Sequence, residues 1–202
     1  MAYPSVTAPY GFKPINRFDG MPYAGATNQY PVTSGQAVYN GQVVAFVNGG
    51  TVSPVALTSS ASIYAVGVVV GVQYTNSSGQ TVQAQYAPAS GVTNVIAYVV
   101  NDPAAEFKVA VTGNNQTITA VAGTILNTNV QGVTGTGDPS TGNINSSVNG
   151  ASADDDATFL FRVTALIPET VTTAGLYTEV VVKFNGTWHQ HLSTLDTTLY
   201  GE

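Results

Sequence analysis

The sequence predicts an all-β protein, a small β-barrel or β-sandwich with an extended N-terminal arm. Two observations carry this prediction. β-branched residues are abundant, and no stretch shows an apolar stripe at helical spacing. Short runs of alternating or continuously apolar residues are separated by turn-forming pairs such as Asn40-Gly41 and Asn185-Gly186. The 202 residues are enough for one all-β domain or two small ones.

Residues 1–26 form the predicted arm, and residues 27–202 the all-β domain, with a possible subdivision near residues 113–157. Four prolines interrupt the arm, and each removes a backbone donor and restricts the residue before it. The arm also carries several aromatic side chains, which favours packing against a protein surface. Two alternatives stay open, because the arm can fold back over its own domain or reach a neighbouring subunit.

The stretch Ser62–Tyr74 is the predicted central strand. Its even positions are tyrosine and valine, whereas its odd positions are smaller and include Gly67 and Gly71. Because side chains alternate along a strand, we expect the bulky face to line the core. The two glycines should let another backbone approach or let the strand curl.

Further strands follow from the same patterns. Val43–Val47 and Val92–Asn101 are apolar on both faces, as expected of fully buried strands. Glu106–Thr112 alternates cleanly, with Phe107, Val109 and Val111 predicted to point inward. The remaining strand candidates are Gln29–Val47, Thr51–Ser60 (an edge strand or loop), Gln80–Tyr86, Thr117–Val121, Gly123–Leu126, Ala157–Leu166 and Leu176–Phe184.

Two predictions concern the C-terminal half. Asn127–Ser152 is almost entirely Gly, Thr, Asn, Ser and Asp, which predicts a long loop or several short turns on the surface. Asn185-Gly186 predicts a hairpin, with Trp188–Leu192 as the return strand.

Composition excludes several classes of partner. The net charge is −6, and the five basic residues are scattered, so neither nucleic acid nor an anionic membrane is an expected partner. The chain has no cysteine, which excludes disulfides and thiolate chemistry. The N-terminus lacks a basic segment followed by an apolar run, so no secretory signal is predicted and synthesis in a cytoplasm is expected.

No catalytic residue, cofactor or metal site is predicted, and the chain is not expected to be an enzyme. His189 and His191 have a workable metal-ligand spacing, but the nearest carboxylate in sequence is Asp196. The cluster Asp154–Asp156 matches no calcium-binding loop pattern, which favours a solvated loop end. No pattern pairs the carboxylates that a glycosidase would need; the candidates are Glu106, Glu169 and Glu179.

Four segments carry a family resemblance: APYGFKPIN (Ala8–Asn16), YNGQVVAF (Tyr39–Phe46), YAVGVVVGVQYTNSSG (Tyr64–Gly79) and YVVNDPAAEFKV (Tyr98–Val109). With these segments, which are spread over residues 8–109, about half of it, the chain resembles the cement or decoration proteins on tailed-bacteriophage capsids, particularly those of cyanophages and marine phages.

The resemblance implies a non-enzymatic structural virion protein on the outer capsid surface. Such proteins clamp adjacent subunits of the major capsid protein, often as homotrimers, and stabilise the shell against internal DNA pressure. The capsid or subunit contacts expected on the arm are Tyr10, Phe12, Lys13, Arg17 and Phe18. Deleting Met1–Asn16 should then abolish capsid binding and leave the domain folded.

The alternative function is a receptor- or carbohydrate-binding β-sandwich module of a phage fibre, a tail or an adhesin. Such modules often bind sugars through exposed aromatic side chains in loops. The candidate residues for this role are Trp188, Tyr177 and Tyr200.

Overall fold

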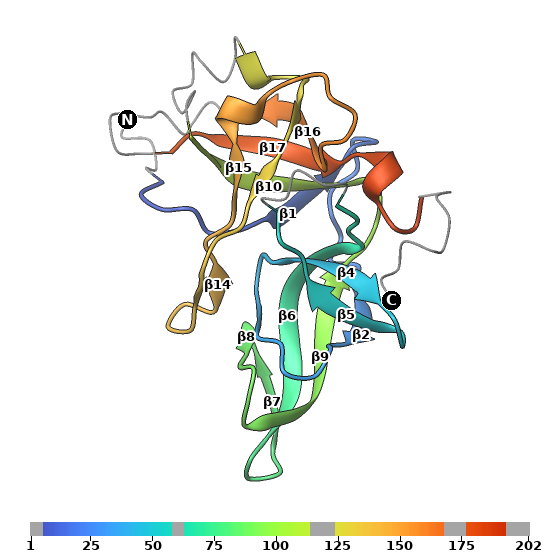
Figure 1. Cartoon of the computed structure of the whole chain (residues 1–202), viewed down its shortest axis with the longest axis vertical. Coiled ribbons are helices and arrows are strands. Elements are labelled where there is room, and N and C mark those ends of the chain that lie inside the picture. Colours follow the sequence, from blue (N-terminus) through green and yellow to red (C-terminus); the bar gives the residue numbers. More distant parts are fainter. Residues whose placement is uncertain (1–5, 58–62, 114–123, 168–176, 193–202) are drawn as a thin grey trace.

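The computed structural model describes residues 6–57, 63–113, 124–167 and 177–192. It confirms the all-β prediction: strands dominate, and the helical elements of the described part include two short 3₁₀ helices, η2 (Gly150–Ser152) and η3 (Gly186–Trp188). No helix in the described ranges has the length and apolar character needed to cross a bilayer. Figure 1 shows two sheets stacked along the long axis of the molecule.

The upper sheet in Figure 1 is a nearly closed barrel. Its strands are hydrogen-bonded in the order β11-β16-β17-β10-β15-β12, and β1 also pairs with β10. Only one residue separates β11 from β12 in the chain. Because β11 pairs with β16 and β12 pairs with β15, this short stretch connects the two ends of the sheet and nearly closes the barrel. We call this sheet the upper barrel; its strands are β1 (Lys13–Arg17), β10 (Ala105–Thr112), β11 (Asn129–Val130), β12 (Gly132–Val133), β15 (Ser147–Asn149), β16 (Phe161–Leu166) and β17 (Glu179–Phe184).

The lower sheet curls back on itself in a similar way. Its order is β2-β9-β6-β4-β5, and β7 pairs with the far half of β6. Val32, which follows β2 at one end of the sheet, forms a bridge with Val52 of β5 at the other end. We call this sheet the lower barrel; its strands are β2 (Asn28–Pro31), β4 (Val43–Val47), β5 (Thr51–Pro54), β6 (Gly67–Asn76), β7 (Thr81–Ala84) and β9 (Val92–Val100).

Two short strand pairs complete the fold. The chain of the lower barrel also forms β3 (Val38–Tyr39), which pairs with β8 (Tyr86–Ala87). The segment between β12 and β15 forms a hairpin of β13 (Gly137–Asp138) and β14 (Asn143–Ile144). Asn40 bridges to Asn143, so this hairpin links the two barrels.

Strand β6 supplies side chains to both hydrophobic cores. Val68 belongs to the core of the upper barrel, whereas Val69 and Val72 belong to the core of the lower barrel. The register with β9 shifts between Val69 and Gly71, and such a bulge changes which face a side chain occupies. The even positions Val66, Val68 and Val72 are buried as predicted, but they belong to two cores, and Val69 on the predicted small face is buried as well.

The predicted close approach of a backbone at Gly67 is confirmed. A Cβ atom added at Gly67 would collide with the carbonyl group of Val100 on the neighbouring strand. At Gly71 the nearest atoms would be 3.8 Å away, which is an ordinary contact. Only the first of the two glycines is therefore required by packing.

The two cores differ in composition. The upper core contains large aromatic side chains, including Phe12, Phe107, Phe161, Phe184 and Trp188. All buried members of the lower core are valine or alanine: Val32, Val38, Val44, Val52, Val66, Val69, Val72, Ala87, Ala97 and Val99. Phe107, Val109 and Val111 of β10 point inward as predicted and have no exposed surface.

The prediction of a surface loop at Asn127–Ser152 was wrong. This segment supplies β11, β12 and β15 to the upper barrel, and Ser146 and Ser147 are buried. The Ser146 hydroxyl accepts from the Gly135 N–H (3.0 Å), and the Ser147 hydroxyl lies 2.7 Å from that of Thr112. A polar sequence can enter the interior here because its side chains find hydrogen-bond partners.

The predicted hairpin at Asn185-Gly186 was also wrong. The chain forms η3 there, and His189 then pairs in parallel with Ala65. The Asn185 amide donates to the Phe159 carbonyl (2.6 Å), and these contacts direct the chain away from β17. The predicted strand Thr117–Val121 and part of Gly123–Leu126 lie outside the described residues.

Candidate contact site

The N-terminal segment is built into the upper barrel. β1 runs antiparallel to β10, with Lys13 opposite Lys108 and Arg17 opposite Ala105. The Phe12 ring has no exposed surface and stacks on Phe161, with 4.6 Å between the ring centroids. Described residues of the arm therefore fold back over their own domain.

Before β1, the segment passes over the outer side of β17 and β10. Val6 accepts a hydrogen bond from the N–H of Tyr177 (2.9 Å), just ahead of β17. The Tyr10 hydroxyl donates to the buried carboxylate of Glu179, which also pairs with Lys108 at 3.0 Å. Burial, followed by the interaction with Glu179, raises the pKa of Tyr10 above its ordinary value. These groups hold the segment against the barrel.

Gly11 lets the segment pass between the two barrels. Its N–H donates to the Ser146 carbonyl (3.1 Å), and the N–H of Phe12 donates to the Gly41 carbonyl (3.0 Å). Gly11 has φ 81°, and a Cβ there would lie 2.6 Å from Cγ2 of Ile144. The position therefore needs glycine for both its backbone angle and its space.

After β1 the chain reverses in a tight turn, residues 17–22. The Arg17 N–H donates to the Met21 carbonyl (2.8 Å), and the Met21 N–H donates to the Asp19 carboxylate (3.2 Å). Arg17 forms ion pairs with Asp19 (3.2 Å) and Asp102 (3.1 Å). The Phe18 N–H donates to the Ala104 carbonyl (2.8 Å), so the turn is fixed to the loop between the barrels.

This turn presents two large apolar side chains to solvent. Phe18 is 59% exposed and Met21 is 58% exposed. The ammonium group of Lys183 lies 3.7 Å from the centroid of the Phe18 ring, a cation–π contact that orients the ring. We call this pair the Phe18–Met21 knob. Aromatic residues, Met and Arg are enriched in the centres of protein interfaces, and rigid anchors lose little entropy on binding.

The structure separates the five expected contact residues into two groups. Arg17 and Phe18 lie at the knob, whereas Tyr10 is partly buried by its contact with Glu179. Phe12 is completely buried in the core, so it has no surface to offer a partner. The Lys13 ammonium donates to the Asn143 side chain (2.6 Å), and burial lowers the pKa of Lys13 to about 8.

Met21 was missed in the sequence. The signal that could have found it is the pair Asp19-Gly20, which is typical of a tight turn. A turn at that position places the residues on either side of it, Phe18 and Met21, at the surface.

The histidine pair lies at the junction of the barrels. His189 is fully buried and packs against Phe184, with 5.6 Å between ring centroids. Burial, followed by the neighbouring His191, lowers the pKa of His189 to about 4. Within the described ranges no three His, Cys, Asp or Glu side chains form a group that could hold a metal ion, and Asp196 lies outside those ranges.

The acidic candidates have structural partners. The backbone of Asp154 pairs with Asn129, and the Asp156 carboxylate accepts from the N–H of Thr158 (2.8 Å). That hydrogen bond lowers the pKa of Asp156. The Glu106 carboxylate accepts from the hydroxyl of Thr164 (2.7 Å), and Glu169 lies outside the described residues.

Trp188 offers no open ring face for a sugar. It is 8% exposed, and its indole N–H donates to the Ala157 carbonyl (2.6 Å). Tyr177 is partly buried beside Val6, and Tyr200 lies outside the described residues.

Comparisons with protein-family models, curated proteins and solved structures found no match. The capsid resemblance of the sequence motifs therefore remains a prediction.

Proposed function

We propose that the chain is a non-enzymatic structural virion protein that binds the outer surface of a tailed-phage capsid and cements adjacent subunits of the major capsid protein. The observation that carries this proposal is the Phe18–Met21 knob, a pair of exposed apolar side chains on a hydrogen-bonded turn, surrounded by charged side chains. Two of the segments that resemble cement proteins, Ala8–Asn16 and Tyr98–Val109, lie side by side in the structure at the base of this knob.

The proposed mechanism is mass action. A protein that binds the assembled shell and not its separated subunits stabilises the shell, by about 2.7 kcal/mol per site at a free concentration one hundred times the Kd. In a homotrimer, three knobs would engage together, and linked contacts bind more tightly than single ones. Synthesis in the host cytoplasm and assembly onto the outer capsid surface follow from this role.

The test is co-sedimentation of the purified chain with expanded shells of the phage that encodes it. Replacing both Phe18 and Met21 by alanine should weaken shell binding by roughly 30-fold or more, the effect expected of interface hot spots. The matched control is Leu192→Ala, because Leu192 is 53% exposed and lies in a different part of the structure. Equal binding by the double variant and the control would contradict the proposal.

Deleting the N-terminal arm does not test capsid binding separately from folding. Deleting residues 1–16 was expected to leave the domain folded, but it would remove Phe12 from the core and most of β1 from the barrel. Loss of binding by such a variant would report unfolding as readily as a lost contact. The point variants at the knob avoid this problem.

A homotrimer is part of the proposal. Light scattering of the purified chain should then give a mass near three times 20.8 kDa, either alone or on release from shells. A chain that stays monomeric in both conditions would contradict the trimer and leave the knob to act singly.

A further inference from the structure

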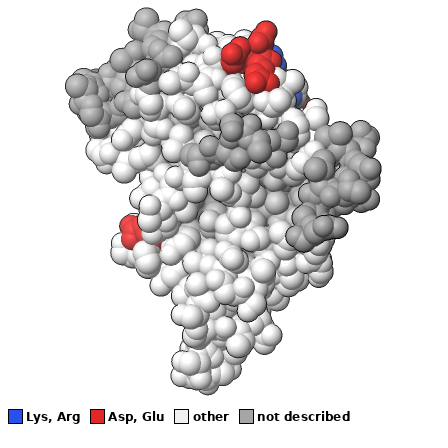
Figure 2. Space-filling model, viewed as in Figure 1, with Lys and Arg blue, Asp and Glu red and all other residues white. Residues whose placement is uncertain are grey.

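The lower barrel carries no charge. No Asp, Glu, Lys, Arg or His occurs between Asp19 and Asp102, and this interval contains every strand of the lower barrel. Figure 2 shows the consequence, because the lower part of the molecule is white in that view, whereas the coloured side chains lie above it. The surface of this barrel consists of hydroxyl, amide and apolar groups.

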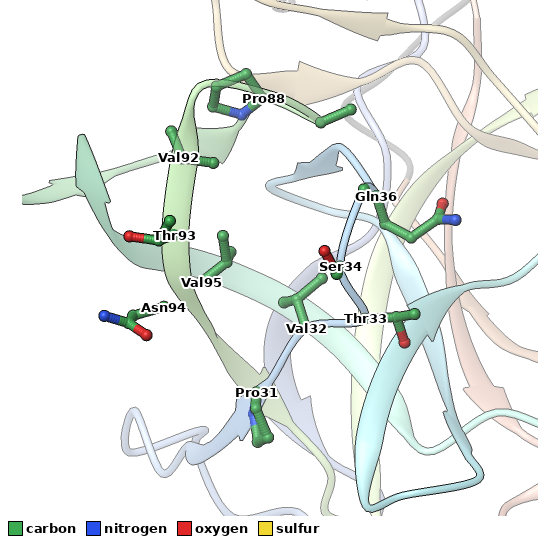
Figure 3. Close-up of a pocket in the computed structure, with 12 residues that line it drawn as sticks. Pro31, Val32, Thr33, Ser34, Gln36, Pro88, Val92, Thr93, Asn94 and Val95 are labelled. Atoms are coloured by element: carbon green, nitrogen blue, oxygen red, sulfur yellow. The ribbon is translucent and has the colours of Figure 1, made fainter. Parts of the chain in front are cut away.

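A pocket of about 250 Å³ lies on the lower barrel, between the loop that follows β2 and the beginning of β9. Figure 3 shows Pro88, Val92 and Val95 on one side, facing Val32 and Ser34 on the other. Thr93 and Asn94 also line the pocket, but their side chains point away from its centre.

Hydrogen bonds fix both walls of the pocket. The Val32 N–H donates to the Val95 carbonyl (2.9 Å), and the Thr33 N–H donates to the Val52 carbonyl (2.9 Å). The Gln36 N–H donates to the Thr33 carbonyl (3.3 Å), which closes the loop into a turn. The pocket is therefore formed before any ligand arrives, as binding sites usually are.

The lining excludes several ligand classes. A charged ligand would lose its hydration without gaining an opposite charge, which is costly. The lining has no aromatic side chain, so it offers no platform on which a sugar ring or a nucleobase can stack. A hydrocarbon would cover the Ser34 hydroxyl at the rim without offering it a hydrogen-bond partner, whereas the Gln36 amide points away from the pocket in Figure 3.

We infer that this pocket binds an uncharged, extended peptide segment of a protein partner, with a proline or small aliphatic side chain seated between the valines. A peptide fits both parts of the lining, because its side chain meets the apolar walls and its backbone amides meet the polar rim. This inference is independent of the capsid proposal, since its test uses only the purified chain and synthetic peptides.

The test is an array of acetylated and amidated heptapeptides built from Gly, Ala, Val, Pro, Ser, Thr, Asn and Gln, with the central residue varied to include Glu and Lys. The labelled chain should bind peptides with a central Pro or Val. A central Glu or Lys should weaken binding by about tenfold or more. The same peptides should shift the amide NMR signals of Val92 and Val95.

Two variants locate the binding. Ser34→Tyr places a ring in the pocket and should weaken binding by about tenfold or more. Thr93→Tyr is the matched control, because the Thr93 side chain points away from the pocket, and it should bind like the wild type. Equal binding by Ser34→Tyr, equal binding of charged peptides, or no binding at millimolar peptide would overturn the inference.

Discussion

The two barrels have the same type of secondary structure but different chemistry. The upper barrel has an aromatic core and carries ion pairs on and around its outer face, such as Lys108–Glu179 and Arg17–Asp102. The lower barrel has a core of valine and alanine and no charged side chain. In the upper barrel, charges fix the N-terminal segment and orient the knob. The two proposed contact surfaces differ in the same way: the Phe18–Met21 knob is surrounded by charged side chains, whereas the pocket of the lower barrel is lined by uncharged residues.

The largest expected effect is that of Phe12→Ala, which should lower the free energy of unfolding by about 3–5 kcal/mol, because a fully buried aromatic ring is removed. Urea unfolding measures the loss. Hydrogen exchange should show faster opening of β10 and β17 than of β6 and β9. Equal acceleration in both barrels would contradict separate cores, and Phe18→Ala is the surface control.

Acid should destabilise the junction through His189. The folded state favours the neutral ring, since burial lowers its pKa to about 4 from the ordinary 6.5. As the pH falls from about 6.5 to 4, the unfolded chain takes up a proton that the folded chain excludes, so the free energy of unfolding falls by up to about 3 kcal/mol. This contribution is fully present above pH 6.5.

The measurement for His189 is urea unfolding across that pH range. His189→Gln should flatten the pH dependence relative to the wild type. His191→Gln should retain most of it, because His191 is exposed. Parallel pH curves for wild type and His189→Gln would show that another group is responsible.

Gly67→Ala should destabilise the lower barrel by about 1–3 kcal/mol, because the added Cβ meets the Val100 carbonyl and the strands must move apart. The matched change on the same strand is Gly71→Ala, where the nearest atoms would be 3.8 Å away. We expect that variant to stay within about 0.5 kcal/mol of the wild type. Thermal unfolding of the two variants measures the difference. Equal losses of stability in Gly67→Ala and Gly71→Ala would contradict the close contact at Gly67.

The smallest expected effect is that of salt. The ion pairs of Arg17 are partly exposed, so high ionic strength should lower the free energy of opening of the turn at Met21 by less than about 1 kcal/mol. Amide exchange in β6 and β9 should not change, because the lower barrel has no charge to screen. A comparable salt effect on exchange in both barrels would contradict the claim that charged side chains stabilise only the upper barrel.

The strands were predictable where their pattern was simple. Glu106–Thr112 alternates and became β10, and the apolar run Val92–Asn101 became β9. Asn127–Ser152 was not predictable as barrel strands, since the burial of Ser146 and Ser147 depends on hydrogen bonds to residues distant in the sequence or to neighbouring loops. Local pattern alone does not reveal such partners.

The candidate site was predictable only in part. Phe12 and Phe18 belong to the same aromatic, proline-rich segment, yet one is buried and the other is exposed. The difference arises because Phe12 enters a core completed by Phe161, a contact between residues far apart in the chain. The neutral pocket required the fold, because its walls come from two segments that meet only in the lower barrel.

The most direct test of the central claim is hydrogen–deuterium exchange of the chain, free and bound to expanded capsid shells. The account predicts protection on binding at the turn of residues 17–22, which presents Phe18 and Met21. Exchange in the interior strands β10 and β17 should change little, because they are already buried. Shell binding without protection of this turn, or no binding to shells, would contradict the claim.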